Sequence, residues 1–122
     1  MNLPHRYPFR WIERAENDRA LALVSSDSCW IRGNAPLPVA FVAEIVAQAA
    51  ALLLEDPAAG AREPRERWLA GIERLELHRP VVAGDLLEVT VAAGRRFGPA
   101  TRVEGRIAIA GETVAEAVLL LV

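Results

Sequence analysis

The pattern of apolar and polar positions divides the chain around one long apolar segment. Residues 38–54 are apolar on every face, and only Glu44 and Gln48 interrupt the run. The segment is too short and too rich in alanine to be read as a membrane span, so it predicts a helix buried in a core. Pro38 suits the first turn of such a helix, because proline lacks the N–H that this position leaves unpaired.

The residues on both sides of this helix follow patterns that are typical of strands. Apolar residues alternate with polar ones most clearly at 86–97 and 103–109, and Gly98-Pro99 and Ala110-Gly111 mark turns between strands. The polar stretch 16–19 predicts a hairpin turn, whereas the Pro/Gly-rich, charged stretch 57–66 predicts a surface loop. The strands expected from these patterns are 9–14, 20–24, 68–77 (broken by Gly71), 86–97, 103–109 and 114–122.

This order of elements predicts an α+β fold in a single domain spanning residues 1–122. A sheet that must cover one apolar helix has to curl around it, with the helix forming one layer on one face. One helix does not cover the whole sheet, and the last strand ends in a continuous apolar run. Both features favour dimerisation through paired sheet edges or packed faces.

Composition and charge exclude several classes of function. The net charge is −2 and no basic stripe is evident, which argues against nucleic acid as a partner. The N-terminal residues lack the apolar run of a signal peptide, so the cytoplasm is the expected location. The single Cys29 cannot form an intramolecular disulfide, and with only His5 and His78 it cannot build a zinc site. We expect neither a metal nor a cofactor.

The two polar residues of the long helix are candidates for chemistry. Glu44 and Gln48 are four residues apart, so they lie on the same helix face, one turn from each other. An ionised carboxylate in apolar surroundings is costly unless it has a partner or a proton, and the segment contains no basic residue. Glu44 is therefore a candidate acid–base residue. The alternative is that Glu44 reaches solvent at an edge of the helix.

Five motifs along the chain resemble those of one enzyme family. They are 3–9 (LPHRYPF), 44–48 (EIVAQ), 70–72 (AGI), 78–85 (HRPVVAGD) and 115–117 (AEA). Their order is similar to that in the 3-hydroxyacyl-[acyl carrier protein] dehydratases of type II fatty acid synthesis. The resemblance implies a hotdog fold, in which a curved antiparallel sheet wraps a long central helix. It also implies a homodimer or higher homo-oligomer with its active site at the dimer interface, and an acyl carrier protein whose phosphopantetheine arm brings the substrate.

The resemblance assigns roles to residues on the helix and beside it. Glu44 matches the family's helix glutamate, which handles the departing hydroxyl, and Gln48 matches the glutamine one turn later. The backbone N–H groups of Val39 and Ala40 stand where the family polarises the thioester carbonyl. Gly71 lies in the AGI motif. Gln48, Val39, Ala40 and Gly71 are therefore expected to bind the substrate.

The loop before the helix departs from the family pattern. The family has Gly-His-Phe-Pro there, with the histidine as general base, whereas this chain reads Gly33-Asn-Ala-Pro36. Asn34 cannot act as a base at neutral pH, so we expect it to orient water or to bind the substrate. His5 is the candidate replacement, with a structural cap of the first strand as its alternative role. A shortened loop with a retained Glu and Gln resembles the divergent branch of aryl polyene and related pigment clusters.

The resemblance implies a lyase that dehydrates 3-hydroxyacyl-carrier-protein thioesters in fatty acid or polyene biosynthesis. Two alternatives stay open, because the loop histidine is missing: a non-catalytic acyl-binding hotdog subunit, or a hotdog acyl thioesterase in which the helix carboxylate activates water. Arg62, Arg65 and Arg67 form either a solvated loop face or a dock for an acidic carrier protein.

Overall fold

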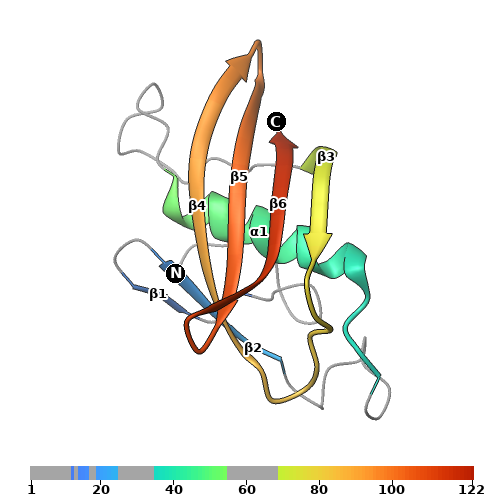
Figure 1. The fold of residues 1–122 in the computed structure, drawn as a ribbon. Helices are drawn as coiled ribbons and strands as arrows, with labels where there is room; N and C mark the ends of the chain where they lie inside the picture. The colour runs from blue at the N-terminus through green and yellow to red at the C-terminus, as the bar shows by residue number, and fades with distance from the viewer. Residues whose placement is uncertain (1–11, 13, 17–18, 25–34, 55–68) are drawn as a thin grey trace.

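The computed structural model describes residues 12, 14–16, 19–24, 35–54 and 69–122. These residues form one helix and six strands, which gives the predicted α+β class (Figure 1). The elements are β1 (Arg14–Glu16), β2 (Arg19–Leu23), α1 (Val39–Leu53), β3 (Leu69–Leu77), β4 (Leu86–Phe97), β5 (Ala100–Ile109) and β6 (Glu112–Leu121).

All six strands join one sheet in the order β1-β2-β4-β5-β6-β3, and every neighbouring pair is antiparallel. The long strands β4, β5 and β6 form its centre, and β3 lies at the edge beyond β6. Figure 1 shows the helix crossing one face of the sheet, which curves around it. This is the arrangement expected of a hotdog fold.

The core lies between the helix and the concave face of the sheet. Alternation within β5 places Val103, Gly105 and Ile107 in the interior and leaves Glu104 and Arg106 exposed. Gly105 is required here, because a Cβ at this position would lie 2.2 Å from Cγ1 of Val46 on the helix. The helix contributes the buried residues Val42, Ala43, Ile45, Val46, Ala47, Gln48, Ala49 and Ala50.

The predicted elements agree closely with the observed ones where the chain is described. The helix differs from the expected 38–54 by one residue at each end, and β4 has the expected bounds. The register shift beside Gly71 confirms the expected break in β3. β5 is longer than expected, since it begins at Ala100 and not at 103. The first hairpin is confirmed, but β1 occupies Arg14–Glu16 instead of 9–14, of which only residues 12 and 14 are described.

Two predicted turns are confirmed by their backbone angles. Gly98, with φ of +59°, and Pro99 connect β4 to β5, as in a type II′ hairpin turn. Ala110 and Gly111 have φ of 49° and 83° and connect β5 to β6, as in a type I′ turn. Ala110 is the one non-glycine residue of the described chain with positive φ. In the described part of the chain, no helix has the length and apolar character needed to cross a membrane.

Candidate functional site

One face of the helix carries a stripe that runs from the surface into the core. Ala40, Glu44 and Gln48 follow each other at intervals of four residues, so they share this face. Ala40 is exposed, Glu44 is half-buried and Gln48 is completely buried. The predicted acid–base residue therefore lies where the solvent-facing end of the helix passes into the apolar core.

Gln48 links Glu44 to the N-terminal part of the chain. Its Nε2 donates a hydrogen bond to Oε1 of Glu44 over 3.4 Å. Its Oε1 accepts one from the backbone N–H of Ile12 over 3.3 Å. A buried amide is costly unless its polar atoms are paired, so these bonds fix the orientation of the Gln48 side chain. The amide in turn fixes the carboxylate of Glu44, which makes Gln48 a supporting residue for Glu44.

The start of the helix presents backbone donors. Among the described residues, no side chain forms a capping hydrogen bond there, and the first turn contains no acidic residue. The first N–H groups of a helix have no partner within the helix and lie at its positive end. Val39 and Ala40 occupy this end, and both are exposed. Val39 lies about 7.5 Å along the axis from Glu44, at the usual rise per residue.

The connection between β3 and β4 holds this helix start in place. Leu37, which is buried, donates its N–H to the carbonyl oxygen of Val81 over 2.7 Å. Within the connection, Oδ2 of Asp85 accepts the N–H of Val82 over 2.9 Å and lies 3.6 Å from Nη1 of Arg79. The HRPVVAGD motif therefore has a structural role, because it builds the loop on which the chain entering the helix rests.

The other predicted site residues are not all brought to this stripe. Gly71 lies on the edge strand β3, opposite Leu120 of β6, and its role as a substrate contact stays a prediction. His5 and Asn34 lie outside the described residues, and so do Arg62, Arg65 and Arg67. The identity of the general base is therefore untested by the structure.

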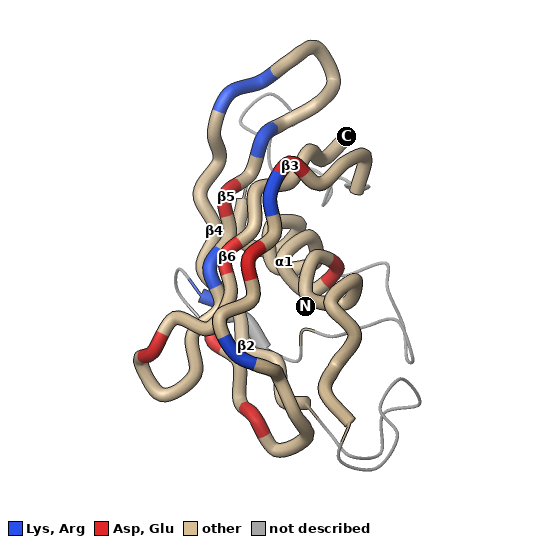
Figure 2. The backbone as a smooth tube through the Cα atoms, turned by 45° about the vertical axis from the view of Figure 1, so that its right-hand side comes forward, with Lys and Arg blue, Asp and Glu red and all other residues tan. Residues whose placement is uncertain are grey.

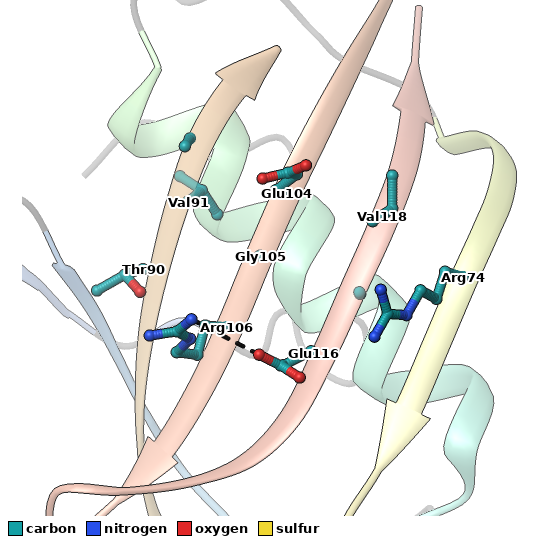
Figure 3. Close-up of a pocket in the computed structure, with 10 residues that line it drawn as sticks. Arg74, Thr90, Val91, Glu104, Gly105, Arg106, Glu116 and Val118 are labelled. Carbon is teal, nitrogen blue, oxygen red and sulfur yellow. Dashed lines mark ion pairs between the residues drawn. The ribbon is translucent and has the colours of Figure 1, made fainter.

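A shallow depression of about 410 Å³ lies on the opposite face of the sheet, away from the helix (Figure 3). Charged side chains from three strands line it, and Nη2 of Arg106 lies 3.6 Å from Oε1 of Glu116. Its lining residues are Arg74, Thr90, Val91, Ala92, Glu104, Gly105, Arg106, Glu116, Ala117 and Val118. Neither Glu44 nor Gln48 lines this depression, so it is distinct from the candidate active site.

Beside the depression, an ion-pair network joins β3 to β6. Nε2 of His78 lies 3.3 Å from Oε2 of Glu116, and Nη2 of Arg74 lies 2.9 Å from Oε2 of Glu76. The hydrogen bond from Arg74 lowers the pKa of the Glu76 carboxyl and raises that of the guanidinium. The ligand-type atoms of Glu76, His78 and Glu116 lie within 4.8 Å of one another. Arginines already compensate both carboxylates, so we interpret the cluster as an ion-pair network.

Sequence reasoning missed the partner of Gln48 and this network. Both depend on segments far apart in the chain, since Ile12 and Gln48 are separated by 36 residues and His78 and Glu116 by 38. The register of β3 with β6, which places Glu76 opposite Glu116, was not evident from either strand alone. His78 is exposed.

Comparison with known proteins identifies relatives over nearly the whole chain. The chain is 33% identical over 125 residues to the 3-hydroxyacyl-[acyl-carrier-protein] dehydratase FabZ of Cereibacter sphaeroides, covering 94% of this chain and 81% of that protein. It is 35% identical over 131 residues to FabZ of Klebsiella pneumoniae, covering 97% and 85%. No family model matches the chain.

Solved structures with the same fold include members of different functional classes. The dehydratase heterocomplex ApeI:P from Xenorhabdus doucetiae superposes with a TM-score of 0.78 at 21% identity, covering 98% of this chain and 86% of that chain. A thioesterase from Thermus thermophilus superposes with a TM-score of 0.59 at 18% identity, covering 84% and 76%. These likenesses show the hotdog fold. The identity to FabZ over more than nine-tenths of the sequence shows the family, and the chain belongs to the FabZ-like 3-hydroxyacyl-[acyl-carrier-protein] dehydratases.

Proposed function

We propose that this protein dehydrates 3-hydroxyacyl thioesters of an acyl carrier protein to trans-2-enoyl thioesters, with Glu44 as an acid–base residue. The observation that carries the proposal is the stripe of Ala40, Glu44 and Gln48. It places a carboxylate, held by a buried amide, one turn below the first backbone N–H groups of the helix. Membership of the FabZ-like family supports the same reaction.

The reaction uses these groups in a definite order. The N–H groups of Val39 and Ala40 donate to the thioester carbonyl oxygen and stabilise the negative charge that develops there. A general base removes the proton on the carbon next to the carbonyl. Glu44 gives a proton to the 3-hydroxyl group, which leaves as water while the carbon–carbon double bond forms.

The base must come from outside the helix stripe. Asn34 replaces the loop histidine of the family and has no basic group. We assign the role to His5 of a second, identical subunit, consistent with a dimer whose active sites lie at the subunit interface. In such a dimer, the edge strand β3 would pair with the second subunit and extend the sheet across the interface.

A second candidate function is a subunit that works with a different hotdog protein. The structural similarity to a dehydratase heterocomplex favours it, together with the loss of the loop histidine. In this arrangement Glu44 of this chain would complement a histidine from a homologous partner. We also place the chain in the aryl polyene branch, and hence in polyene biosynthesis, because its shortened loop with retained Glu44 and Gln48 resembles that branch.

Mass spectrometry of a 3-hydroxyacyl carrier protein incubated with the purified protein tests these alternatives. Loss of one water mass supports dehydration by the chain alone, and release of free carrier protein supports a thioesterase. Absence of any change, followed by dehydration once a histidine-containing homologue is added, supports the heteromeric subunit.

Two substitutions assign the residues. Glu44→Gln should abolish dehydration, whereas the same change at the exposed Glu104 of β5 should leave it intact. His5→Ala should lower turnover strongly, and unchanged turnover would remove His5 from the chemistry.

A further inference from the structure

The connection between β3 and β4 carries charge of both signs and lies at the end of the sheet opposite the β4–β5 turn (Figure 2). Its acidic residue is Asp85, and only 16% of this side chain is exposed. Oδ2 of Asp85 accepts the N–H of Val82 over 2.9 Å, and the N–H of Asp85 donates to the carbonyl oxygen of Val82 over 3.2 Å. Between them, Gly84 has φ of +96°, a conformation that glycine adopts readily. Asp85 therefore fixes both backbone polar groups of Val82.

The peptide group between Val81 and Val82 transmits this constraint to the chain that enters the helix. The N–H of Val82 and the carbonyl of Val81 belong to one planar unit, so neither turns without the other. Asp85 holds the N–H side of this unit, and the carbonyl oxygen on its other side accepts the N–H of Leu37 over 2.7 Å. Val81 and Leu37 are both buried. Rotation of the peptide away from Asp85 would therefore break the bond to Leu37 as well.

The charge of Asp85 strengthens this chain of hydrogen bonds. A hydrogen bond to an ionised carboxylate is roughly twice as strong as one between neutral groups, and bonds in a chain polarise one another. Arg79 supports the carboxylate, since its Nη1 lies 3.6 Å from Oδ2 of Asp85 and donates to the carbonyl oxygen of Pro80 over 3.2 Å. The carboxylate therefore makes the carbonyl of Val81 a better acceptor for Leu37 than a neutral side chain would.

The same turn is anchored to two neighbouring strands of the sheet. The N–H of Gly84 donates to the carbonyl oxygen of Val24 over 2.7 Å, and the N–H of Val24 donates to the carbonyl oxygen of Asp85 over 2.9 Å. Val24 directly follows β2, and Asp85 directly precedes β4, which pairs with β2. The position of the helix start relative to the sheet therefore depends on this turn.

We propose that Asp85 is a positioning residue for the dehydration, because it holds the first N–H groups of α1 where the thioester carbonyl binds. Leu37 precedes the helix by two residues, and the proposed reaction uses the N–H groups of Val39 and Ala40. The inference rests on the proposed function, which supplies the carbonyl group. Such donors must lie within hydrogen-bond distance of the developing oxyanion, and a displacement of about 1 Å is enough to cost on the order of 100-fold in rate.

Kinetics with a short 3-hydroxyacyl N-acetylcysteamine thioester test the inference, because this substrate needs no carrier protein. Asp85→Ala should lower kcat about 10- to 100-fold and change KM less, since the N–H groups of the helix start stabilise charge that develops in the transition state. Asp85→Asn keeps an oxygen that accepts the N–H of Val82 but lacks the charge, so its kcat should lie about 2- to 5-fold below that of the parent.

A matched control separates positioning from a general effect on the fold. Glu112→Ala removes an exposed carboxylate beside the β5–β6 turn and should leave kcat unchanged. A purely structural role of Asp85 would lower the Tm of Asp85→Ala and leave kcat of the folded variant at the parent value. That result would overturn the inference, and so would an equal loss of kcat in Glu112→Ala.

Amide hydrogen exchange separates this inference from the proposed function. In Asp85→Ala the N–H of Leu37 should exchange at least about 10-fold faster, while the N–H of the buried Ile107 in β5 keeps its parent rate. Unchanged exchange at Leu37 would overturn the inference even if kcat falls. A parent without dehydratase activity would refute the proposed function, and exchange at Leu37 would still decide whether Asp85 holds the helix start. Should Asp85→Ala fail to fold, both measurements are made on Asp85→Asn, and parent values in both would overturn the inference.

Discussion

Replacing Gly105 with alanine inserts a methyl group between the helix and the sheet. The added Cβ would lie 2.2 Å from Cγ1 of Val46, whereas two carbon atoms pack best at about 3.5–4.0 Å. Relief therefore requires a shift of more than about 1 Å by the helix or by β5. Overpacking of this kind costs about 1–3 kcal/mol, which corresponds to a Tm lower by roughly 4–12 °C for a chain of this size.

A compensating change at the helix distinguishes overpacking from a general defect. Val46→Ala removes both methyl groups and leaves its Cβ 3.3 Å from the new Cβ, which a small adjustment accommodates. Alone, Val46→Ala should cost about 2 kcal/mol through lost burial and a cavity. The double variant should be more stable than the sum of the two single effects predicts, by about 1–2 kcal/mol.

Thermal and urea unfolding of the parent, the two single variants and the double variant measure this coupling. Gly71→Ala is the control, because a Cβ there meets Leu120 at an ordinary 3.7 Å and should change stability by less than about 0.5 kcal/mol. Strict additivity of Gly105→Ala and Val46→Ala would refute the close contact. Recovery of dehydratase activity in the double variant would further show that the contact sets the position of Glu44.

Three further substitutions test other features of the molecule. Gln48→Leu should destabilise the fold by about 1–3 kcal/mol and lower turnover by releasing Glu44; a loss of stability with kcat unchanged would deny Gln48 a positioning role. Arg74 lowers the pKa of Glu76 below its ordinary value of 4.5. The pair therefore stabilises the fold fully at pH values above 4.5, and this stabilisation is lost as the pH falls and Glu76 becomes protonated. The unfolding midpoints of parent and Glu76→Gln should therefore converge in acid, and a constant difference would contradict this. Ala110→Asn should raise the free energy of unfolding by about 0.5–1 kcal/mol, since asparagine adopts positive φ more readily than alanine. Calorimetry should show a higher Tm, and an unchanged or lower Tm would contradict this.

Local patterns in the sequence were sufficient for the helix and most strands. Residues 38–54 predicted α1 within one residue at each end, because an apolar segment of this length, interrupted only by Glu44 and Gln48, leaves few alternatives to a buried helix. Gly98-Pro99 and Ala110-Gly111 predicted their hairpins for a similar reason, since few residues adopt the backbone angles that these turns need. The start of β5 at Ala100 was missed, because Thr101 and Arg102 show no apolar alternation between the turn signal at Pro99 and position 103.

The face shared by Glu44 and Gln48 also follows from the sequence, since their spacing of four is fixed by the helix period. The sequence alone did not determine what Gln48 binds, that β3 pairs with β6 at the far edge of the sheet, or that Gly105 must admit Val46. Each of these contacts joins residues more than 30 positions apart, and the pattern around one residue carries no record of its distant partner. Local periodicity determined the elements and the carboxylate's face, whereas the depth of Glu44 and the support beneath it were decided by packing between distant segments.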